Sequence, residues 1–420
     1  MLLNQTDKIK LLNSLRNGVP TSGLLDYLIT GRDGMIQETN KILNYTSRGV
    51  GTFKFITGEY GSGKTFLLHY MAKSAIEENF VVSKLTINKA FRLNKLDDLY
   101  YNIMHNLYIN HENSEKQTNF DDIFYNWIQQ LKKTENAASI QSEINRVIEN
   151  ISKFNTSFGR AFLAYIKASI TGDNETKDAA SSWLTGESNV PLHLKEKFHV
   201  IGKVDKLNML DFLKAFINLV EFMGYKGLIV LIDEVDLLIN ERSDIRLSGY
   251  INIKHLLDTL SGGEFGNTTF VFSASSVLFS NKEKGISSYE ALHQRICNTI
   301  SKESGNAQNY RNNLIELKNL NFLDYQILTN KIHKLFSSVY DIQMDITLES
   351  LRNWVFLLYK KENKNYKNIT IRDFISRLIE ILDIISQNPK KHIFNTNIEM
   401  QLNGSELLFK SKSMQKVVND

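Results

Sequence analysis

The sequence is poor in several residue types, and each shortage excludes a class of protein. Its single cysteine, Cys297, excludes an internal disulfide and any metal site built from several cysteines. Only 3 prolines occur in 420 residues, which leaves little room for long disordered linkers. No run approaches the roughly 20 apolar residues that a membrane span requires, because even GLIVLIDEVDLLI contains acidic residues. We therefore expect a folded protein without a membrane segment.

Neither sign of charge dominates the chain. The formal net charge is +4 and the basic residues are spread along the sequence, so composition permits contact with nucleic acid without requiring it. The first residues, MLLNQTDKIKLLNSL, lack the basic, apolar and small-residue order of a signal peptide, and we expect a cytoplasmic protein. The length predicts two or three domains, or one large domain with an appendage.

The clearest motif is GEYGSGKT at 58–65, which fits the phosphate-binding P-loop pattern. A short apolar run, FKFIT, precedes it as a predicted strand, and TFLLHYMAKSAIEEN follows with helical spacing. In such a loop the backbone N–H groups bind phosphates, a lysine neutralises the β and γ phosphates, and a hydroxyl binds Mg²⁺. The residues that we assign to the nucleotide here are Gly58, Glu59, Tyr60, Gly61, Ser62, Gly63, Lys64, Thr65 and Phe66.

A second motif, KGLIVLIDEVDLLI at 226–239, has the form of a buried strand that ends in acid. We expect Asp233 to hold Mg²⁺ through water, together with Thr65, and Glu234 to polarise the attacking water. Asp236 is better explained as a surface residue. A nucleotide-binding protein without turnover would not need Glu234, so the motif favours hydrolysis of ATP with Lys64 and Glu234 as catalytic residues.

These motifs resemble those of the BrxD-like ATP-binding proteins of bacterial BREX phage-defence systems. That family belongs to the AAA+ P-loop ATPases and is similar to the origin-recognition and Cdc6 group. Further segments with the family's order are GVPTSGLLDYLITGRD, AASSWLTGE, GISSYEALHQRI and NITIRDFISRLIEILD, so the resemblance spans roughly residues 15 to 390.

The resemblance implies roles for three arginines outside the two motifs. Arg32, in GRD, corresponds to a position near the adenine, although a surface turn also explains it. Arg372, at the start of a predicted C-terminal helix, corresponds to a lid arginine that contacts the nucleotide, with Arg377 as the reserve. Arg295 lies where an arginine finger for a neighbouring subunit is expected, and a surface salt bridge is the alternative.

The resemblance also implies a polar sensor at the end of a third strand, TTFVFSASS at 268–276. Ser275 is the first choice and Ser273 the second. An ordinary strand end entering a turn explains these serines about equally well.

The two motifs lie far apart, so we expect a large helical insertion between them, in which Trp183 is a packing residue rather than a base-stacking platform.

The predicted fold class is α/β: a three-layer AAA+ core with a parallel sheet, this insertion, and a C-terminal helical lid or winged-helix-like element. The lysine- and tyrosine-rich loop at 360–368 is expected to be solvated rather than bound to nucleic acid. The expected boundaries are 1–94 and 223–316 for the core, 95–222 for the insertion, 317–395 for the lid and 396–420 for a tail.

The resulting hypothesis is a Mg²⁺-dependent ATPase of an antiphage defence system that assembles or remodels a complex on DNA. Its expected partners are ATP, other products of the defence operon such as a helicase or a TerB-like protein, DNA, and further copies of itself. Two alternatives remain open: a nucleotide-gated scaffold or DNA-binding adapter with negligible turnover, and a replication-initiator-like loader.

Overall fold

The computed structural model describes residues 4–18, 25–111, 114–134, 137–297, 308–341, 348–364, 369–388, 399–402 and 405–408. The chain forms two compact units. The sheet unit comprises Gly34–Thr57 and Met71–Glu316, and the helical unit comprises Met1–Asp33, Gly58–Tyr70 and Leu317–Asp420.

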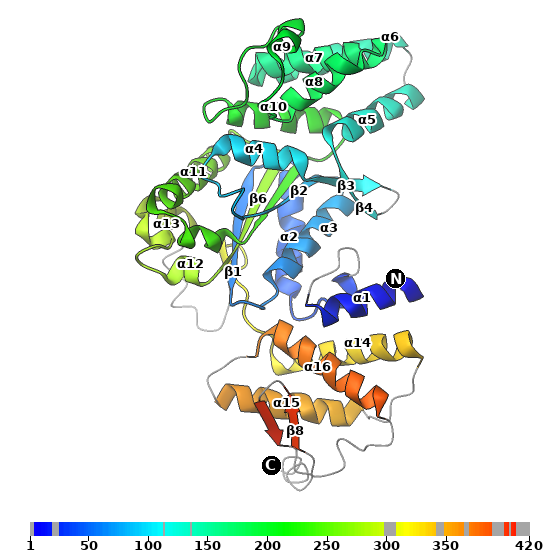
Figure 1. Ribbon diagram of the computed structural model, residues 1–420, viewed down its shortest axis with the longest axis vertical. Coiled ribbons are helices and arrows are strands. Elements are labelled where there is room, and N and C mark those ends of the chain that lie inside the picture. The colour runs from blue at the N-terminus through cyan, green and yellow to red at the C-terminus, as the bar shows by residue number, and fades with distance from the viewer. Residues whose placement is uncertain are drawn as a thin grey trace. The chain divides into compact units, whose positions relative to one another are not determined.

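The sheet unit is built on seven strands in the order β4-β3-β2-β5-β6-β1-β7. Figure 1 labels five of them, β1, β2, β3, β4 and β6. Strands β2, β5 and β6 pair in parallel, as do β1 and β7, whereas β3 and β4 form an antiparallel hairpin at one edge. This mainly parallel sheet confirms the predicted α/β class. The strands are β1 (Thr52–Gly58), β2 (Val81–Thr86), β3 (Leu107–His111), β4 (Ser114–Thr118), β5 (Leu228–Asp233), β6 (Thr268–Ser275) and β7 (Leu314–Glu316).

The central strands are near-continuous apolar runs because both of their faces are buried, and every residue of β5 is buried. β6 lies between β5 and β1. The Thr52 and Thr269 hydroxyl oxygens lie 2.7 Å apart, and the ring of Phe55 stacks on Phe272 at 4.6 Å. In both pairs the residue of β6 has a number 217 higher than its partner in β1, so the two strands advance together and run in the same direction. The carboxyl ends of β1, β5 and β6 therefore meet at one edge of the sheet, where ligands bind in open α/β folds.

The insertion between the two motifs is mostly helical, as predicted, and shares one continuous hydrophobic core with the sheet. Trp183 is 2% exposed, and its indole N–H donates to the Gly202 carbonyl at 3.2 Å, which confirms its packing role. The apolar spacing of LDDLYYNIMHNLY at 96–108 predicts a helix through Tyr108. That prediction was wrong: the helix ends at His105 and β3 follows, because the chain there pairs with β2. The helices are α4 (Leu96–His105), α5 (Phe120–Thr134), α6 (Ala137–Phe154), α7 (Thr156–Thr171), α8 (Asn174–Leu184), α9 (Leu192–Lys197) and α10 (Met209–Phe222).

The remaining helices of the sheet unit precede β1 or lie between β5 and β7 along the chain. They are α2 (Asp33–Thr46), α11 (Ser243–Ser261), α12 (Val277–Ser280) and α13 (Glu290–Ile296), with the short 3₁₀ helices η2 (Val235–Asn240) and η3 (Ile286–Ser288). Helix α3 (Lys64–Glu77) follows the phosphate loop. Within the described parts of the chain, no helix is long and apolar enough to cross a bilayer.

The helical unit has a core of its own, to which α1 contributes the buried pair Leu11 and Leu12. Asn321 and Asp324 form a reciprocal capping box that starts α14. The loop predicted at 360–368 begins later than expected, because α15 continues through Lys364. Residues 365–368 lie outside the described residues, as do 396–398, 403–404 and 409–420 of the predicted tail. A hairpin, β8–β9, occupies part of the segment expected to be a tail. The elements are α1 (Gln5–Arg16), η1 (Leu25–Tyr27), α14 (Phe322–Tyr340), α15 (Leu348–Lys364), α16 (Ile371–Gln387), β8 (Glu399–Leu402) and β9 (Ser405–Leu408).

Candidate nucleotide site

The phosphate loop connects the end of β1 to the start of α3, the strand–loop–helix context that its motif predicted. Gly61 and Gly63 have φ values of +80° and +96°, in the left-handed region that side chains rarely adopt. A Cβ atom at Gly61 would lie 2.8 Å from the Thr370 hydroxyl oxygen, so this glycine also permits the close approach of α16. The glycines of the motif are therefore required by the backbone path itself.

Two predicted cations bind the backbone carbonyls of the loop. The Lys64 ammonium donates to the carbonyls of Gly58 at 3.1 Å and Glu59 at 3.0 Å. The Arg32 guanidinium donates to the Ser62 carbonyl at 3.1 Å and to the Lys318 carbonyl at 2.8 Å. Arg32 thus joins the loop to the segment leading into α14, and its role near a nucleotide base stays a prediction.

The predicted lid arginine contacts the same loop. Arg372 donates through Nη1 to the Tyr60 hydroxyl at 2.7 Å, and its guanidinium carbon lies 5.1 Å from the centre of the Tyr60 ring. Its Nη2 donates to the Gly18 carbonyl at 3.1 Å, and its backbone N–H to the Gly61 carbonyl at 3.3 Å. Arg377, the reserve candidate, lies further along α16.

The donor chemistry of the loop fits a polyphosphate. Three cationic side chains surround it, and these are the groups that bind phosphate oxygens most strongly. The Ser62 hydroxyl is buried and has no hydrogen-bond partner among the described residues, as expected where a ligand supplies one. Thr65 and Phe66 occupy the first turn of α3, and Phe66 packs against the core of the helical unit.

The acidic motif forms the end of β5 in the sheet unit. Asp233 is 9% exposed, and its Oδ1 accepts hydrogen bonds from the Ser273 hydroxyl at 2.5 Å and from the Glu234 N–H at 2.9 Å. Glu234 has a φ of 63°, a left-handed conformation that costs a non-glycine residue about 1 kcal/mol or more. Strain of this kind concentrates at functional sites because the surrounding structure must impose it.

The two candidate sensor serines contact different carboxylates. Ser273, the second choice, binds Asp233 and is fully buried. Ser275, the first choice, binds Asp236: its hydroxyl and its backbone N–H donate to the two carboxylate oxygens, each at 2.8 Å. Asp236, expected to be a surface residue, is half-buried and fixes the end of β6 through these bonds.

Arg295 forms a surface ion pair within its own chain. Its Nε donates to Asp258 Oδ1 at 2.8 Å, and the side chain is 39% exposed. Hydrogen bonds from Lys254 and then from Arg295 hold the pKa of the Asp258 carboxyl below its usual value. This geometry matches the salt-bridge alternative, and a role as arginine finger stays a prediction.

A magnesium ion bound with ATP would need few protein ligands, since Mg²⁺ keeps several waters and binds substrate phosphates. Among the described residues, no group of three or more His, Cys, Asp or Glu side chains is arranged to hold a metal alone. The assignment of Asp233 and Thr65 as oxygen ligands of an ion carried by the nucleotide stays a prediction.

Sequence reasoning missed the Gly18 carbonyl and assigned Tyr60 to the site only as a member of the loop. Both contact Arg372, a residue more than 300 positions away. No local pattern in the sequence marks such a contact.

Comparison with known proteins gives a family match and matches to solved structures, two of which follow. The family described as "BREX system ATP-binding protein BrxC/D" matches residues 3–400. Domain III of the replication initiation protein DnaA from Thermotoga maritima matches at 11% identity and a TM-score of 0.30, covering 87% of this chain and 99% of that one. The ORC2 protein of Aeropyrum pernix, solved as ADPNP–ADP complexes, matches at 13% identity and a TM-score of 0.38, covering 88% and 71%. No curated protein sequence shows a significant match.

Proposed function

The chain belongs to the BREX system ATP-binding protein BrxC/D family, and from this premise we propose that it hydrolyses ATP with Mg²⁺ to assemble or remodel a defence complex on DNA. Binding of ATP follows from the family. The proposal adds four points: that ATP is hydrolysed, that Mg²⁺ is required, that the protein acts on DNA, and that hydrolysis drives assembly or remodelling of a complex.

The observation that carries hydrolysis is the arrangement at the end of β5. Asp233 is held through one carboxylate oxygen by Ser273 and by the Glu234 N–H, which suits a carboxylate that binds a metal-bound water. Glu234 follows in a strained conformation and is only partly buried. A carboxylate next to the metal ligand but separate from it is what a general base for the attacking water requires. A protein that only binds ATP has no need of such a residue.

Each remaining residue has a role that its chemistry supports. Mg²⁺ bound with ATP supplies positive charge that neutralises the phosphate oxygens, and Thr65 and Asp233 are the residues that would hold it. Lys64 binds the β and γ phosphates. Arg372 reaches the phosphate loop directly, so its guanidinium is available to the terminal phosphate. Arg295 and Ser275 stay proposed contributors: the first to a neighbouring subunit, the second through Asp236.

We expect the partners to be other components of the defence operon, such as a helicase or a TerB-like protein, and further copies of this chain. An arginine finger supplied to a neighbour requires at least a dimer. If ATP hydrolysis is measured to be faster in the oligomer than in the monomer, that result will support this part of the proposal.

The test compares steady-state ATP hydrolysis and ATP binding for the wild type and Glu234→Gln, each with and without duplex DNA at a fixed salt concentration. We expect the variant to bind ATP within a few-fold of the wild type and to hydrolyse it about 100-fold more slowly, the usual contribution of a general base. Glu283→Gln makes the same chemical change at an exposed glutamate and serves as the control.

Two results would contradict the proposal. Wild-type turnover no faster than that of Glu234→Gln, with ATP still bound, would identify a nucleotide-gated scaffold. Turnover that DNA leaves unchanged would remove DNA from the account while leaving hydrolysis intact.

A further inference from the structure

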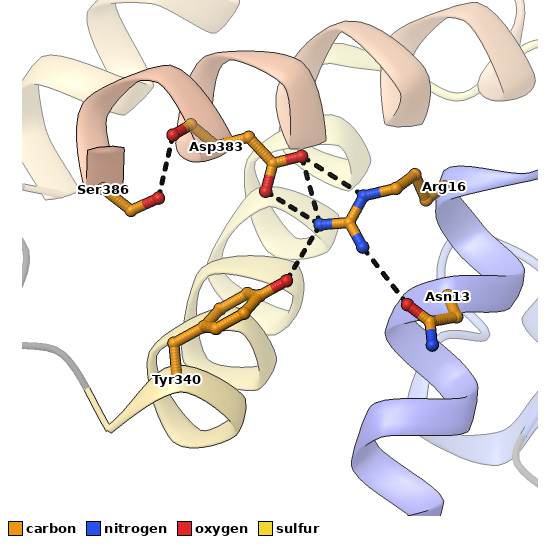
Figure 2. Close-up of polar contacts among 5 residues, drawn as sticks. All are labelled: Asn13, Arg16, Tyr340, Asp383 and Ser386. Carbon is orange, nitrogen blue, oxygen red and sulfur yellow. Dashed lines mark hydrogen bonds and ion pairs between the residues drawn. The ribbon is translucent and has the colours of Figure 1, made fainter. Parts of the chain in front are cut away.

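The end of the N-terminal helix α1 and the residues just after it contact α16 at two separate points within the helical unit. Arg16, its last residue, forms an ion pair with Asp383, with Nη2 donating to Oδ1 at 2.8 Å and to Oδ2 at 3.1 Å and Nε to Oδ2 at 3.2 Å (Figure 2). Two residues later, the Gly18 carbonyl accepts from Arg372. The two attachment points on α16 lie eleven residues apart, or roughly 16 Å along the helix.

The ion pair is supported from both sides. The Tyr340 hydroxyl accepts from Arg16 Nη2 at 3.1 Å, and the Asn13 side-chain oxygen accepts from Nη1 at 3.2 Å. Figure 2 shows the guanidinium in contact with these groups from α1, α14 and α16. A bidentate pair with extra acceptors holds a fixed geometry better than an ordinary surface pair does. The end of α1 is therefore held in one position on α16.

That position determines where Gly18 lies. Gly18 has a φ of +65°, and a Cβ atom there would lie 3.4 Å from Arg372 Nε, so the backbone approaches the arginine closely. The guanidinium of Arg372 then has the Gly18 carbonyl on one side and the Tyr60 hydroxyl of the phosphate loop on the other. Both acceptors are uncharged, and a phosphate oxygen is a stronger acceptor for a guanidinium than either.

We propose that α1 is a positioning strap for Arg372: the Arg16–Asp383 ion pair places the Gly18 carbonyl, and this carbonyl and the Tyr60 hydroxyl hold the guanidinium at the phosphate loop. When ATP binds, a phosphate oxygen replaces the Tyr60 hydroxyl, while the Gly18 carbonyl keeps its contact. Arg16 and Asp383 touch no nucleotide and act only through Arg372. This inference rests on the proposed hydrolysis of ATP.

The experiment measures kcat and KM for ATP in four variants of the full chain. Arg16→Ala and Asp383→Asn break the ion pair, and the second keeps the shape of the side chain. The charge reversal Arg16→Asp with Asp383→Arg restores it. Lys10→Ala removes a charge from an exposed position of the same helix and is the matched control.

We expect both breaking variants to lower kcat roughly tenfold with KM changed less than about twofold, because a displaced catalytic contact costs rate more than ground-state binding. The charge reversal should recover at least about half of the loss, and Lys10→Ala should match the wild type. Equal kcat values for Arg16→Ala and Lys10→Ala would overturn the proposal. So would a loss that follows reduced thermal stability and is not recovered by the charge reversal.

A second measurement needs no hydrolysis and separates this inference from the proposed function. Hydrogen exchange of the first turn of α16, followed by mass spectrometry, should be faster in Arg16→Ala than in Lys10→Ala. If the wild type fails to hydrolyse ATP, the proposed function fails, and this measurement alone decides on the strap. Equal exchange in the two variants would overturn it.

Discussion

Two lysines ten positions apart, Lys54 and Lys64, make the same kind of contact in two different regions. The Lys54 ammonium, in β1, donates to three successive backbone carbonyls, those of Tyr310 at 3.3 Å, Arg311 at 2.9 Å and Asn312 at 3.0 Å. The Lys64 ammonium donates to two successive carbonyls of the phosphate loop. Contact type alone therefore does not separate a structural lysine from a functional one.

The difference lies in burial and in the backbone that each lysine organises. Lys54 pairs with Glu38 at 2.8 Å, and both side chains are 8% exposed, so no ligand reaches this ammonium. It fixes the turn that leads into β7. Lys64 is half-buried and its carbonyl partners belong to a loop whose glycines are in left-handed conformations. There a phosphate is a stronger acceptor than the carbonyls and can replace them.

The largest effect should come from Lys64→Ala. Removing the ammonium removes charge-assisted hydrogen bonds to two phosphates, each worth about 1.5–3 kcal/mol, so the affinity for ATP should fall at least roughly 100-fold. Calorimetric titration with a non-hydrolysable ATP analogue measures this loss. Lys73→Ala, on the same helix, removes a lysine that pairs with Glu77 and should bind the analogue as the wild type does. Unchanged affinity in Lys64→Ala would mean that the loop does not bind phosphate through this lysine.

Lys54→Met should instead affect stability. It leaves the Glu38 carboxylate buried without its cation, and breaking a buried ion pair from one side costs about 3–5 kcal/mol. Chemical denaturation followed by circular dichroism should show this fall in the free energy of unfolding. Arg242→Met removes an exposed pair with Asp244 and should cost less than about 1 kcal/mol.

A second substitution sharpens the same prediction. Adding Glu38→Leu to Lys54→Met removes the unpaired carboxylate, so the double variant should be more stable than the single one. Recovery will be partial, because the three carbonyls of the turn still lose their donor. A double variant less stable than Lys54→Met would show that the pair itself is not the source of the cost.

The same contrast explains how far the sequence could be interpreted. Strands β1, β5 and β6 and the helix after the loop were predicted because apolar runs and glycine spacing are local signals. The phosphate loop was found in this way, whereas the carbonyl partners of Lys54 lie more than 250 positions away from it. The helical spacing of the apolar residues through Tyr108 concealed β3. This strand forms because it pairs with β2, and that pairing leaves no local pattern in the sequence. Contacts between distant segments, such as that of Gly18 with Arg372, could not be predicted because no local sequence pattern marks them.

Two serines on β6, like the two lysines, make the same kind of contact at positions with different proposed roles. Ser273 and Ser275 each donate a hydroxyl hydrogen bond to a carboxylate, one to Asp233 and the other to Asp236. Asp233 is the proposed ligand of the ATP-bound metal, whereas Asp236 fixes the end of the strand. The sequence favoured Ser275, but the contact with Asp233 favours Ser273 as the residue closer to the chemistry.

Ser273→Ala should therefore lower kcat for ATP hydrolysis roughly tenfold, the lower end of the loss that follows removal of a partner that orients a metal ligand. It should also raise the Mg²⁺ concentration needed for half-maximal activity, because Asp233 loses the bond that orients its carboxylate. Ser275→Ala should have the smaller effect on both quantities and leave the magnesium dependence closer to that of the wild type. Magnesium titrations of the steady-state rate for the two variants measure the difference. A larger shift in Ser275→Ala would restore the original assignment, because it would show that the end of β6, rather than the Asp233 carboxylate, is what the polar sensor supports.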